Sequence, residues 1–311
     1  MRARLSSGLI VYAGLIVVTA VFAIVLRDSG FLTIDNFANI LRQTAMVSIM
    51  AFGMTFALSA GEIDLSIGQV VALSSLVAAV LLRETSIFVA VPAALGVGLV
   101  VGLVNGYLTT SLRVPSFLIT LGTAGIVGGL ARLITDLQAV PITNESFTFW
   151  FGSGKIGPVP ILLIWTLAAL LVSHVLYRKS TFGRKVLATG GNRIAARYSG
   201  IDTDRNRIGA LVLCSMAAAL AGLLYAGRLH GARHTIGESD LLTVIAAAVI
   251  GGTSMMGGRG SIVGALMGSL VMGILNNGLI LMHLSVSEQM IARGTIIVIA
   301  VALSLRESKE A

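Results

Sequence analysis

The chain has 311 residues, of which 56% are apolar and 12% are charged, and its 22 Lys and Arg against 14 Asp and Glu give a net charge of +8. A soluble domain carries roughly a quarter charged residues, and a water-soluble globule of this size could not hide so much apolar surface. The composition therefore excludes a soluble enzyme, a nucleic-acid-binding module and a disordered chain, and it indicates an all-α polytopic membrane protein.

Apolar runs long enough to cross a bilayer recur along the whole chain. A helix needs about 20 apolar residues to span the hydrocarbon core. The first run follows Arg2 and Arg4 without a cleavage pattern, so we expect it to be retained as a helix. The sequence predicts about ten transmembrane helices, at 8–26, 43–60, 66–82, 86–110, 117–134, 159–177, 207–226, 242–256, 262–282 and 288–304.

The Lys and Arg residues predict the orientation of these helices. Cytoplasmic loops carry an excess of Lys and Arg, and eight of the 22 lie in the single loop 178–207. With ten spans, this places the loop and both termini in the cytoplasm. We expect one transmembrane domain over 1–311.

Small residues at helical spacing indicate where helices approach each other closely, because apolar contact alone gives little association in lipid. Successive GxxxG steps or similar small-residue pairs occur in four of the runs: Gly98, Gly102 and Gly106; Gly125 and Gly129; Ala218 and Gly222; and Gly260, Gly264 and Gly268, followed by Ser269 and Gly273.

Two parts of the chain resemble each other. Segment 100–123 aligns with 272–295 with seven identities, and GEIDL at 61–65 is echoed by GESDL at 237–241. The shift is five helices, an odd number, so the halves, approximately 8–134 and 159–304, would have opposite topology, as in many transporters. The alternative is chance similarity in a chain rich in Leu, Gly and Val.

Two acids interrupt a long apolar stretch. Charged groups inside a bilayer are costly and by default functional, which makes Glu62 and Asp64 candidates for a gating or structural role in a transporter. Asp64 could instead cap a helix that begins at Leu65. A proton- or ion-coupling role is a further alternative.

A short helix is predicted within the basic loop. Asn192 is a favourable N-cap and Gly200 a favourable stop, which gives a helix over 193–199. Ile194 and Tyr198 share one face, and two arginines lie on another. Such a helix suits docking into a groove on a partner, although it could also lie on the membrane surface.

Signals of catalysis are weak. The sequence has no HExxH, no GxSxG and no cysteine pair, and the run Gly152–Ile156 lacks the first Gly and the Ser or Thr of a phosphate loop. His230 and His234 are four residues apart, but Arg233 between them disfavours a cation. We therefore expect no catalytic residue, no metal site, no cofactor and no nucleotide-hydrolysing site in this chain.

Three motifs carry a resemblance to a known family. GEIDLSIG at 61–68 is similar to GGIDLSVG, with Glu62 in place of the second Gly; the pattern GR…A.GGN..AA..SGI matches 183–201; and GGTSMMGGRG at 251–260 is similar to GGTSLAGGKG, with Asn276-Asn277-Gly278 following. Over roughly 35–303 the chain resembles the permease subunits of bacterial ABC importers for monosaccharides of the ribose, xylose, arabinose and galactose type.

The resemblance implies a division of labour. A periplasmic solute-binding protein would deliver the solute, two identical or paralogous permease subunits in the inner membrane would form the pore, and a cytoplasmic subunit would bind ATP and Mg²⁺. No nucleic acid is involved. The coupling helix that presses on this ATPase would comprise Asn192, Arg193, Ile194, Ala195, Ala196, Arg197, Tyr198, Ser199 and Gly200.

Sugars present many hydrogen-bonding groups, so hydroxyl and amide side chains are expected along the translocation path. The candidates are Gln69, Asn105, Ser116, Asn276 and Asn277. Arg228 and Arg233 are candidates for docking the binding protein. The alternative function is an ion-coupled secondary transporter with an inverted repeat, in which an acid such as Glu62 would carry the coupling.

Overall fold

The structure is a computed structural model that describes the backbone of residues 7–309 and the side chains of residues 12–296 and 298. Its helices and strands, in chain order, are α1 (Ser7–Val25), α2 (Ile34–Ser59), α3 (Ile67–Glu84), α4 (Ile87–Ser111), α5 (Ser116–Thr135), β1 (Val140–Pro141), α6 (Glu145–Thr148), the π-helix η1 (Phe149–Ser153), β2 (Lys155–Ile156), β3 (Val159–Pro160), α7 (Ile161–Arg178), α8 (Thr181–Gly191), α9 (Arg193–Tyr198), α10 (Thr203–Leu229), β4 (Gly231–Ala232), α11 (Asp240–Ile250), α12 (Ile262–Leu281) and α13 (Val286–Lys309).

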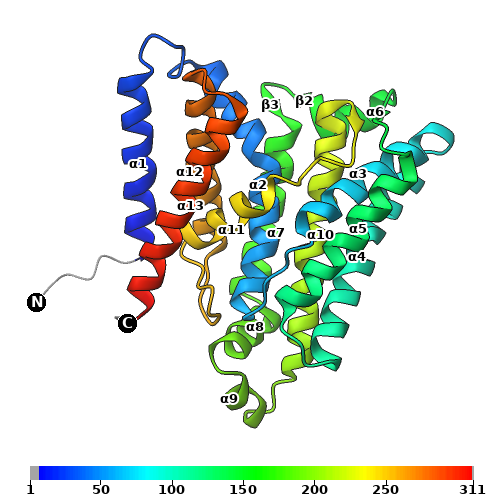
Figure 1. The fold of residues 1–311 in the computed structure, drawn as a ribbon, viewed down its shortest axis with the longest axis vertical. Coiled ribbons are helices and arrows are strands. Elements are labelled where there is room, and N and C mark those ends of the chain that lie inside the picture. Colours follow the sequence, from blue (N-terminus) through cyan, green and yellow to red (C-terminus); the bar gives the residue numbers. More distant parts are fainter. Residues whose placement is uncertain (1–6, 310–311) are drawn as a thin grey trace, which may run out of the picture.

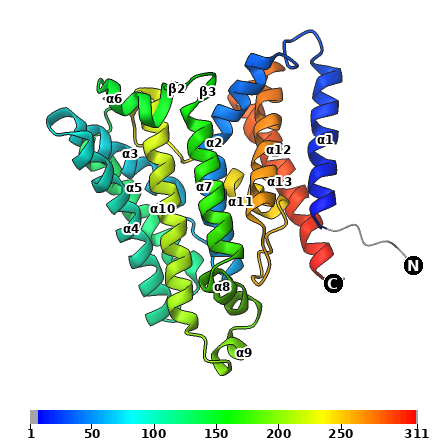
Figure 2. The ribbon, with the colours of Figure 1, turned by 180° about the vertical axis from the view of Figure 1, so that it is seen from behind.

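The helices form a single bundle with two groups on either side of α2 (Figures 1 and 2). One group contains α3, α4, α5 and α10, and the other contains α1, α11, α12 and α13. Helix α2 packs against α10, α12, α11 and α7, and its last four turns are buried throughout. The strands are short antiparallel pairs, β1 with β4 and β2 with β3.

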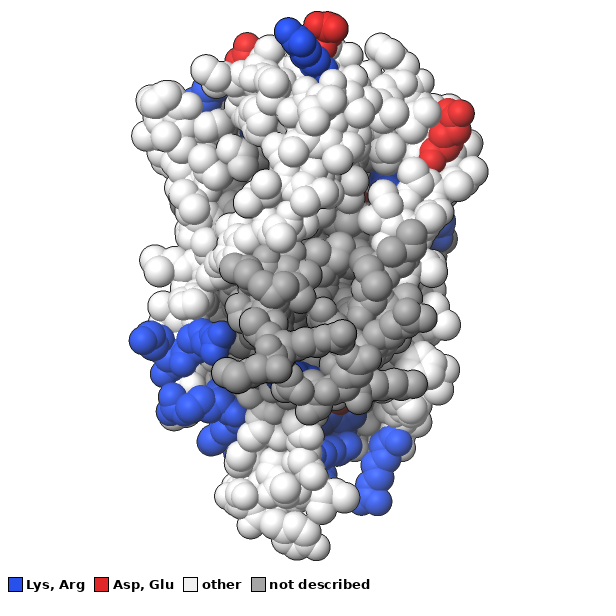
Figure 3. Space-filling model, turned by 90° about the vertical axis from the view of Figure 1, so that its left-hand side faces the viewer, with Lys and Arg blue, Asp and Glu red and all other residues white. Residues whose placement is uncertain are grey.

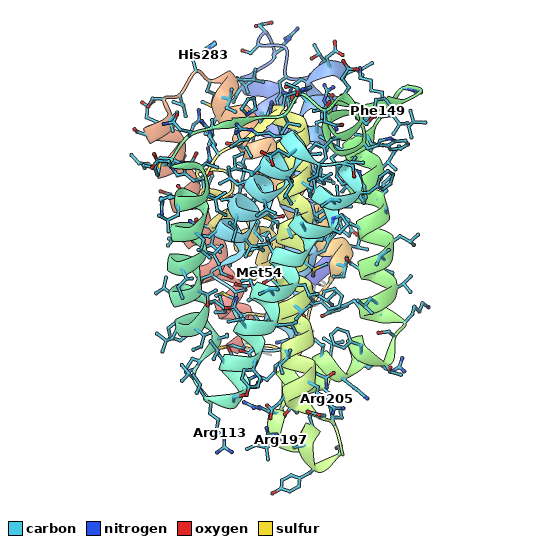
Figure 4. All side chains as sticks on the ribbon, turned by 90° about the vertical axis from the view of Figure 1, so that its right-hand side faces the viewer. Met54, Arg113, Phe149, Arg197, Arg205 and His283 are labelled. Atoms are coloured by element: carbon cyan, nitrogen blue, oxygen red, sulfur yellow. The ribbon has the colours of Figure 1, made fainter. Side chains whose placement is uncertain are left out.

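The two ends of the bundle differ in charge. Arg113, Arg197 and Arg205 lie together at the end that carries α8 and α9, whereas Phe149 and His283 lie at the opposite end (Figure 4). We call the first the α9 end. On the face drawn in Figure 3, most Lys and Arg gather toward the α9 end, and Asp and Glu lie toward the opposite end.

The expected spans agree with the structure for the most part. Seven of the described helices are long and apolar enough to cross a membrane, namely α2, α3, α4, α5, α7, α10 and α12. The span expected at 242–256 is wrong in length: α11 ends at Ile250, and its 11 residues cover about 16 Å, which is too short for a bilayer core. Helix α2 begins at Ile34 rather than at 43, and the helix α8 within the basic loop was not predicted.

Glycines set the closest contacts in the bundle. A Cβ on Gly98, Gly102 or Gly106 of α4 would lie 2.5, 2.6 or 2.8 Å from atoms of α10, in each case from the backbone. The close helix contact predicted at Gly125 and Gly129 in α5 is wrong within this chain, because a Cβ there would meet no described atom within 4 Å. Close approach therefore joins α4 to α10, while these two α5 glycines face away from the rest of the bundle.

Substitution at this contact gives a direct test of the packing. Gly102→Leu is expected to lower the free energy of unfolding by about 1–3 kcal/mol or more, because overpacking forces the two backbones apart. Gly96→Leu on the same helix is the matched control, since a Cβ at Gly96 meets nothing within 4 Å. Unfolding in detergent measures both, and an equal loss for the two variants would contradict the close α4–α10 contact.

Candidate functional site: a junction at the α9 end

The chain between α2 and α3, residues 60–66, is not helical and is referred to here as the break segment. Gly61 has φ +79°, which suits a residue without a side chain. The segment runs inward from the α9 end to the start of α3 (Figure 1). Backbone groups at such a depth must find partners within the protein.

The first turns of α5 supply these partners. The N–H of Ile63 donates to Ser116 Oγ at 2.9 Å, and the N–H of Leu65 donates to Thr120 Oγ1 at 3.0 Å. The same Thr120 hydroxyl lies 3.2 Å from the carbonyl oxygen of Ile63 and donates to it. Ser116, a candidate for the translocation path, therefore satisfies the backbone of the break segment.

Asp64 is fully buried, and both of its carboxylate oxygens accept hydrogen bonds. Its Oδ1 accepts from the N–H of Ser66 at 2.9 Å and from Ser66 Oγ at 2.5 Å, and its Oδ2 accepts from Ser215 Oγ of α10 at 3.0 Å. Asn105 of α4 donates to Ser66 Oγ at 3.0 Å. The predicted helix start at Leu65 is wrong, because α3 begins at Ile67, so Asp64 closes a turn before the helix instead of capping it.

Glu62 forms a buried ion pair with Arg207 in the second turn of α10. The Nε of Arg207 donates to Glu62 Oε1, and the two side chains are only 7% and 5% exposed. Removing one partner of such a pair leaves an uncompensated buried charge. The sequence predicts Arg207 in the basic loop, and nothing in it indicates a pair with Glu62, which lies 145 residues away along the chain.

Helix α9 matches its predicted local structure. Asn192 Oδ1 accepts the N–H of Ala195 at 3.0 Å, and Gly200 ends the turn with φ +78°, so both predicted caps are confirmed. Ile194 and Tyr198 are 70% and 89% exposed. Within the described part of the chain, the apolar face of α9 is left uncovered at the tip of the molecule.

Two motifs that are far apart in the sequence, 183–201 and 251–260, meet at the end of α2, beside the break segment. The N–H of Gly258 donates to the carbonyl of Ser59 at 3.0 Å, and a Cβ at Gly190 would lie 2.0 Å from that carbonyl oxygen. Tyr177 and Ser59 share a hydrogen bond of 2.6 Å. The end of α2, the end of α8 and the loop 251–261 therefore form one close-packed junction next to α9.

A polar cavity of about 380 Å³ lies at this junction. Its walls include Glu62, Ser116, Asn192, Arg193 and Arg207. The cavity therefore connects the break segment with the start of α9.

The N-termini of α3 and α11 meet inside the bundle. A Cβ at Gly68 would lie 2.6 Å from the carbonyl oxygen of Gly237. Gln69, a candidate for the path, lies with its Nε2 3.5 Å from Glu238 Oε1, and Arg132 of α5 pairs with the same oxygen at 3.0 Å. Helices α3 and α11 therefore begin side by side, next to the similar segments GEIDL (61–65) and GESDL (237–241).

A second cavity, of about 200 Å³, lies among α2, α10, α11, α12 and α13. Asn276 and Arg228 both line it, together with Asp240 and Arg293. Tyr225 donates to Asp240 Oδ2 at 2.6 Å. The structure therefore brings a path candidate and a docking candidate to one polar cavity.

The remaining candidates lie apart from these places. Asn277 exchanges hydrogen bonds of 3.0 and 2.9 Å with Asn36 and so links α12 to the start of α2. Arg233 is exposed in the segment between β4 and α11. Among the residues whose side chains are described, no group of three His, Cys, Asp or Glu is placed to hold a metal ion.

Three features define the class of polytopic membrane transport proteins. They are the long apolar helices, a non-helical segment whose backbone groups are hydrogen-bonded inside the bundle, and the paired starts of two helices. The chain belongs to the family described as branched-chain amino acid transport system / permease component, whose model matches residues 36–301. It is a transmembrane permease subunit of an ABC importer.

Its relatives cover nearly the whole chain. It is 39% identical to the ribose import permease protein RbsC of Bacillus subtilis over 96% of this chain and 92% of the relative. It is 36% identical to the L-arabinose transport system permease protein AraH of Escherichia coli over 97% and 90%, and 39% identical to the probable ABC transporter permease protein YphD of the same species over 94% and 89%. No solved structure matches the chain.

The hydroxyl contacts to the break segment lead to a stability prediction. Thr120→Val is expected to lower the free energy of unfolding by about 1–3 kcal/mol, because the N–H of Leu65 loses its partner in a buried place. Thr123→Val is the matched control on the same helix, since Thr123 Oγ1 bonds only to the Ile119 carbonyl of its own helix, and its effect should stay within about 0.5 kcal/mol. Comparable unfolding free energies for the two variants would show that the Thr120 contact does not hold the segment.

Proposed function

We propose that this permease subunit moves a sugar, or a similar small polar solute, from a periplasmic binding protein to the cytoplasm by alternating access. The observation that carries the proposal is the uncovered apolar face of α9 on a chain of this family. Relatives named for ribose and L-arabinose import support a sugar as the solute. A second permease subunit, identical or paralogous, would complete the pore in the bacterial inner membrane.

The charge distribution supports the orientation. Lys and Arg gather toward the α9 end (Figure 3), which by the positive-inside rule is the cytoplasmic end. The first described turn of α1 and the last described turn of α13 also lie toward that end (Figure 1), which supports cytoplasmic termini.

The arrangement of α3–α5 and α11–α13 supports an inverted repeat. The turn between α4 and α5, at Arg113, and the turn between α12 and α13, at His283, lie at opposite ends of the bundle (Figure 4). Both residues have positive φ, 56° and 57°. A five-plus-five repeat of ten helices in one permease domain, with halves approximately at 8–134 and 159–304, would let the bundle open to either side in turn.

The solute path in this proposal uses the partly exposed amides. Gln69 lies where α3 and α11 begin, and Asn276 lines the cavity among α2 and α10–α13. Asn105, Ser116 and Asn277 are engaged in contacts within the chain. In the proposal they hold the helices around the path in place instead of binding the solute. Docking of the binding protein would use Arg233 and, at the rim of the cavity, Arg228.

Energy would come from ATP and Mg²⁺ on a cytoplasmic partner, with α9, flanked by Asn192 and Gly200, as the docking helix. An amphipathic helix placed in a groove of a partner binds through its apolar anchors. Ile194 and Tyr198 are the anchors here, since they are the large exposed apolar residues of α9. This division of roles is consistent with the sequence, which contains no complete phosphate-loop motif.

Uptake by reconstituted vesicles tests the proposed function. With the ATPase and the binding protein present, ribose or L-arabinose is expected to enter only when hydrolysable ATP is supplied. A non-hydrolysable ATP analogue is the control. Uptake that persists without the ATPase, or that follows a proton or sodium gradient, would contradict the proposal and favour the ion-coupled alternative.

Removal of the α9 anchors tests the docking helix. Tyr198→Ala is expected to weaken copurification of the ATPase with the permease by about 30-fold, the effect of losing an anchor worth about 2 kcal/mol. Ile34→Ala is the control, because Ile34 is 87% exposed but lies at the start of α2 at the opposite end. ATPase binding that is equal for both variants would exclude α9 as the principal docking element.

A further inference from the structure

A series of oppositely charged side chains leads from α9 to the break segment. Arg193 and Arg197 of α9 place their Nη2 atoms 2.5 and 2.6 Å from the two carboxylate oxygens of Asp204. Asp204 Oδ1 lies 3.7 Å from Nη1 of Arg207, and Arg207 pairs with Glu62. We call these five residues the ion chain.

Helix α9 and the first turn of α10 are held together as one unit. Besides the contacts to Asp204, Arg197 Nε donates to Thr203 Oγ1 at 2.9 Å. Asp202 caps α10 by accepting the N–H of Arg205 at 3.1 Å. A displacement of α9 is therefore expected to move the first turn of α10, directly before Arg207.

The inner end of the ion chain is the stiffest part. Glu62 and Arg207 are both more than nine-tenths buried, and attraction between charges grows as water is excluded. Separating them would leave two uncompensated buried charges. Arg193, Arg197 and Asp204 are 39%, 53% and 40% exposed, so the outer contacts are individually weaker, but two arginines share the one carboxylate.

Glu62 stands where GGIDLSVG, the motif that residues 61–68 resemble, has its second Gly. A glycine has no side chain with which to reach α10. The break segment of this chain thus carries an ionic link to α10, in addition to its hydrogen bonds with α5 and Ser215.

We propose that Glu62 is a positioning residue for transport: through the ion chain, movement imposed on α9 by the ATPase displaces the break segment and, with it, the N-terminus of α3. The inference rests on the proposed function, because it takes α9 as the docking helix. The break segment continues directly into α3, whose start contacts Gly237 before α11. The ion chain and the break segment together therefore connect the docking face with the place where the two helix starts meet.

The test measures the amount of solute moved per ATP hydrolysed by the complete transporter in vesicles. In Glu62→Gln/Arg207→Gln both charges are removed and no unpaired charge stays buried, so the fold should be kept. The ratio is expected to fall about fivefold or more, the lower range of coupling between sites. Arg207→Lys retains a cation opposite Glu62, so this variant is expected to keep the ratio near that of the wild type.

Asp204→Asn interrupts the ion chain at a half-exposed position with little risk to folding, and it is expected to lower the ratio as well. Arg205→Gln is the matched control, since its side chain is 88% exposed on the same helical turn and outside the ion chain. A wild-type ratio in both the neutral pair and Asp204→Asn would overturn the inference while leaving the proposed function intact. Failure of the wild-type complex to couple uptake to ATP would overturn the proposed function and this inference together.

Discussion

A peptide backbone that leaves helical geometry inside a bilayer must have its hydrogen-bonding groups satisfied by the protein itself, and this requirement shapes the break segment between α2 and α3. Ser116 and Thr120 of α5 accept its N–H groups. Asp64 accepts hydrogen bonds from Ser66 within the segment and from Ser215 of α10. These contacts fix where α3 begins and how α3, α5 and α10 sit around one another.

The same requirement explains why distant motifs converge. The end of α2 exposes the carbonyl of Ser59, and Gly258 supplies a donor to it. Gly190 allows the end of α8 to approach the same carbonyl, where any larger residue would collide. The segment that leads into α9 is thereby packed against the end of α2, beside the break segment that the ion chain joins to α9.

Much of the fold follows from composition and apolar periodicity, because long apolar runs in lipid have little choice but to be helical. The exceptions have physical causes. The first turns of α2 contain Asp35, Asn36 and Arg42, so their low hydropathy hides a helix that Thr33 caps. Helix α8 contains three glycines and two basic residues, a composition that predicts a loop. In the structure the segment is helical and packs against α7 and α10.

The candidate site was predicted unevenly for a similar reason. The caps of α9 are local and could be derived from Asn192 and Gly200. Glu62 and Asp64 stand out in an apolar stretch, but their partners do not, because Arg207 and Ser215 lie about 150 residues away on α10. Amide and hydroxyl side chains that suit a sugar path are equally suited to satisfying backbone groups. Only the structure shows that Ser116 bonds to the backbone of the break segment whereas Gln69 does not.

Amide hydrogen exchange of the permease in lipid nanodiscs tests this account most directly. If the break segment is held as described, the amides of Ile63 and Leu65 should exchange as slowly as those in the buried turns of α2. Exchange as fast as in the exposed turn between β2 and β3 would contradict the account, because the segment would then not be bound to α5 and could not serve as a fixed link between α9 and α3.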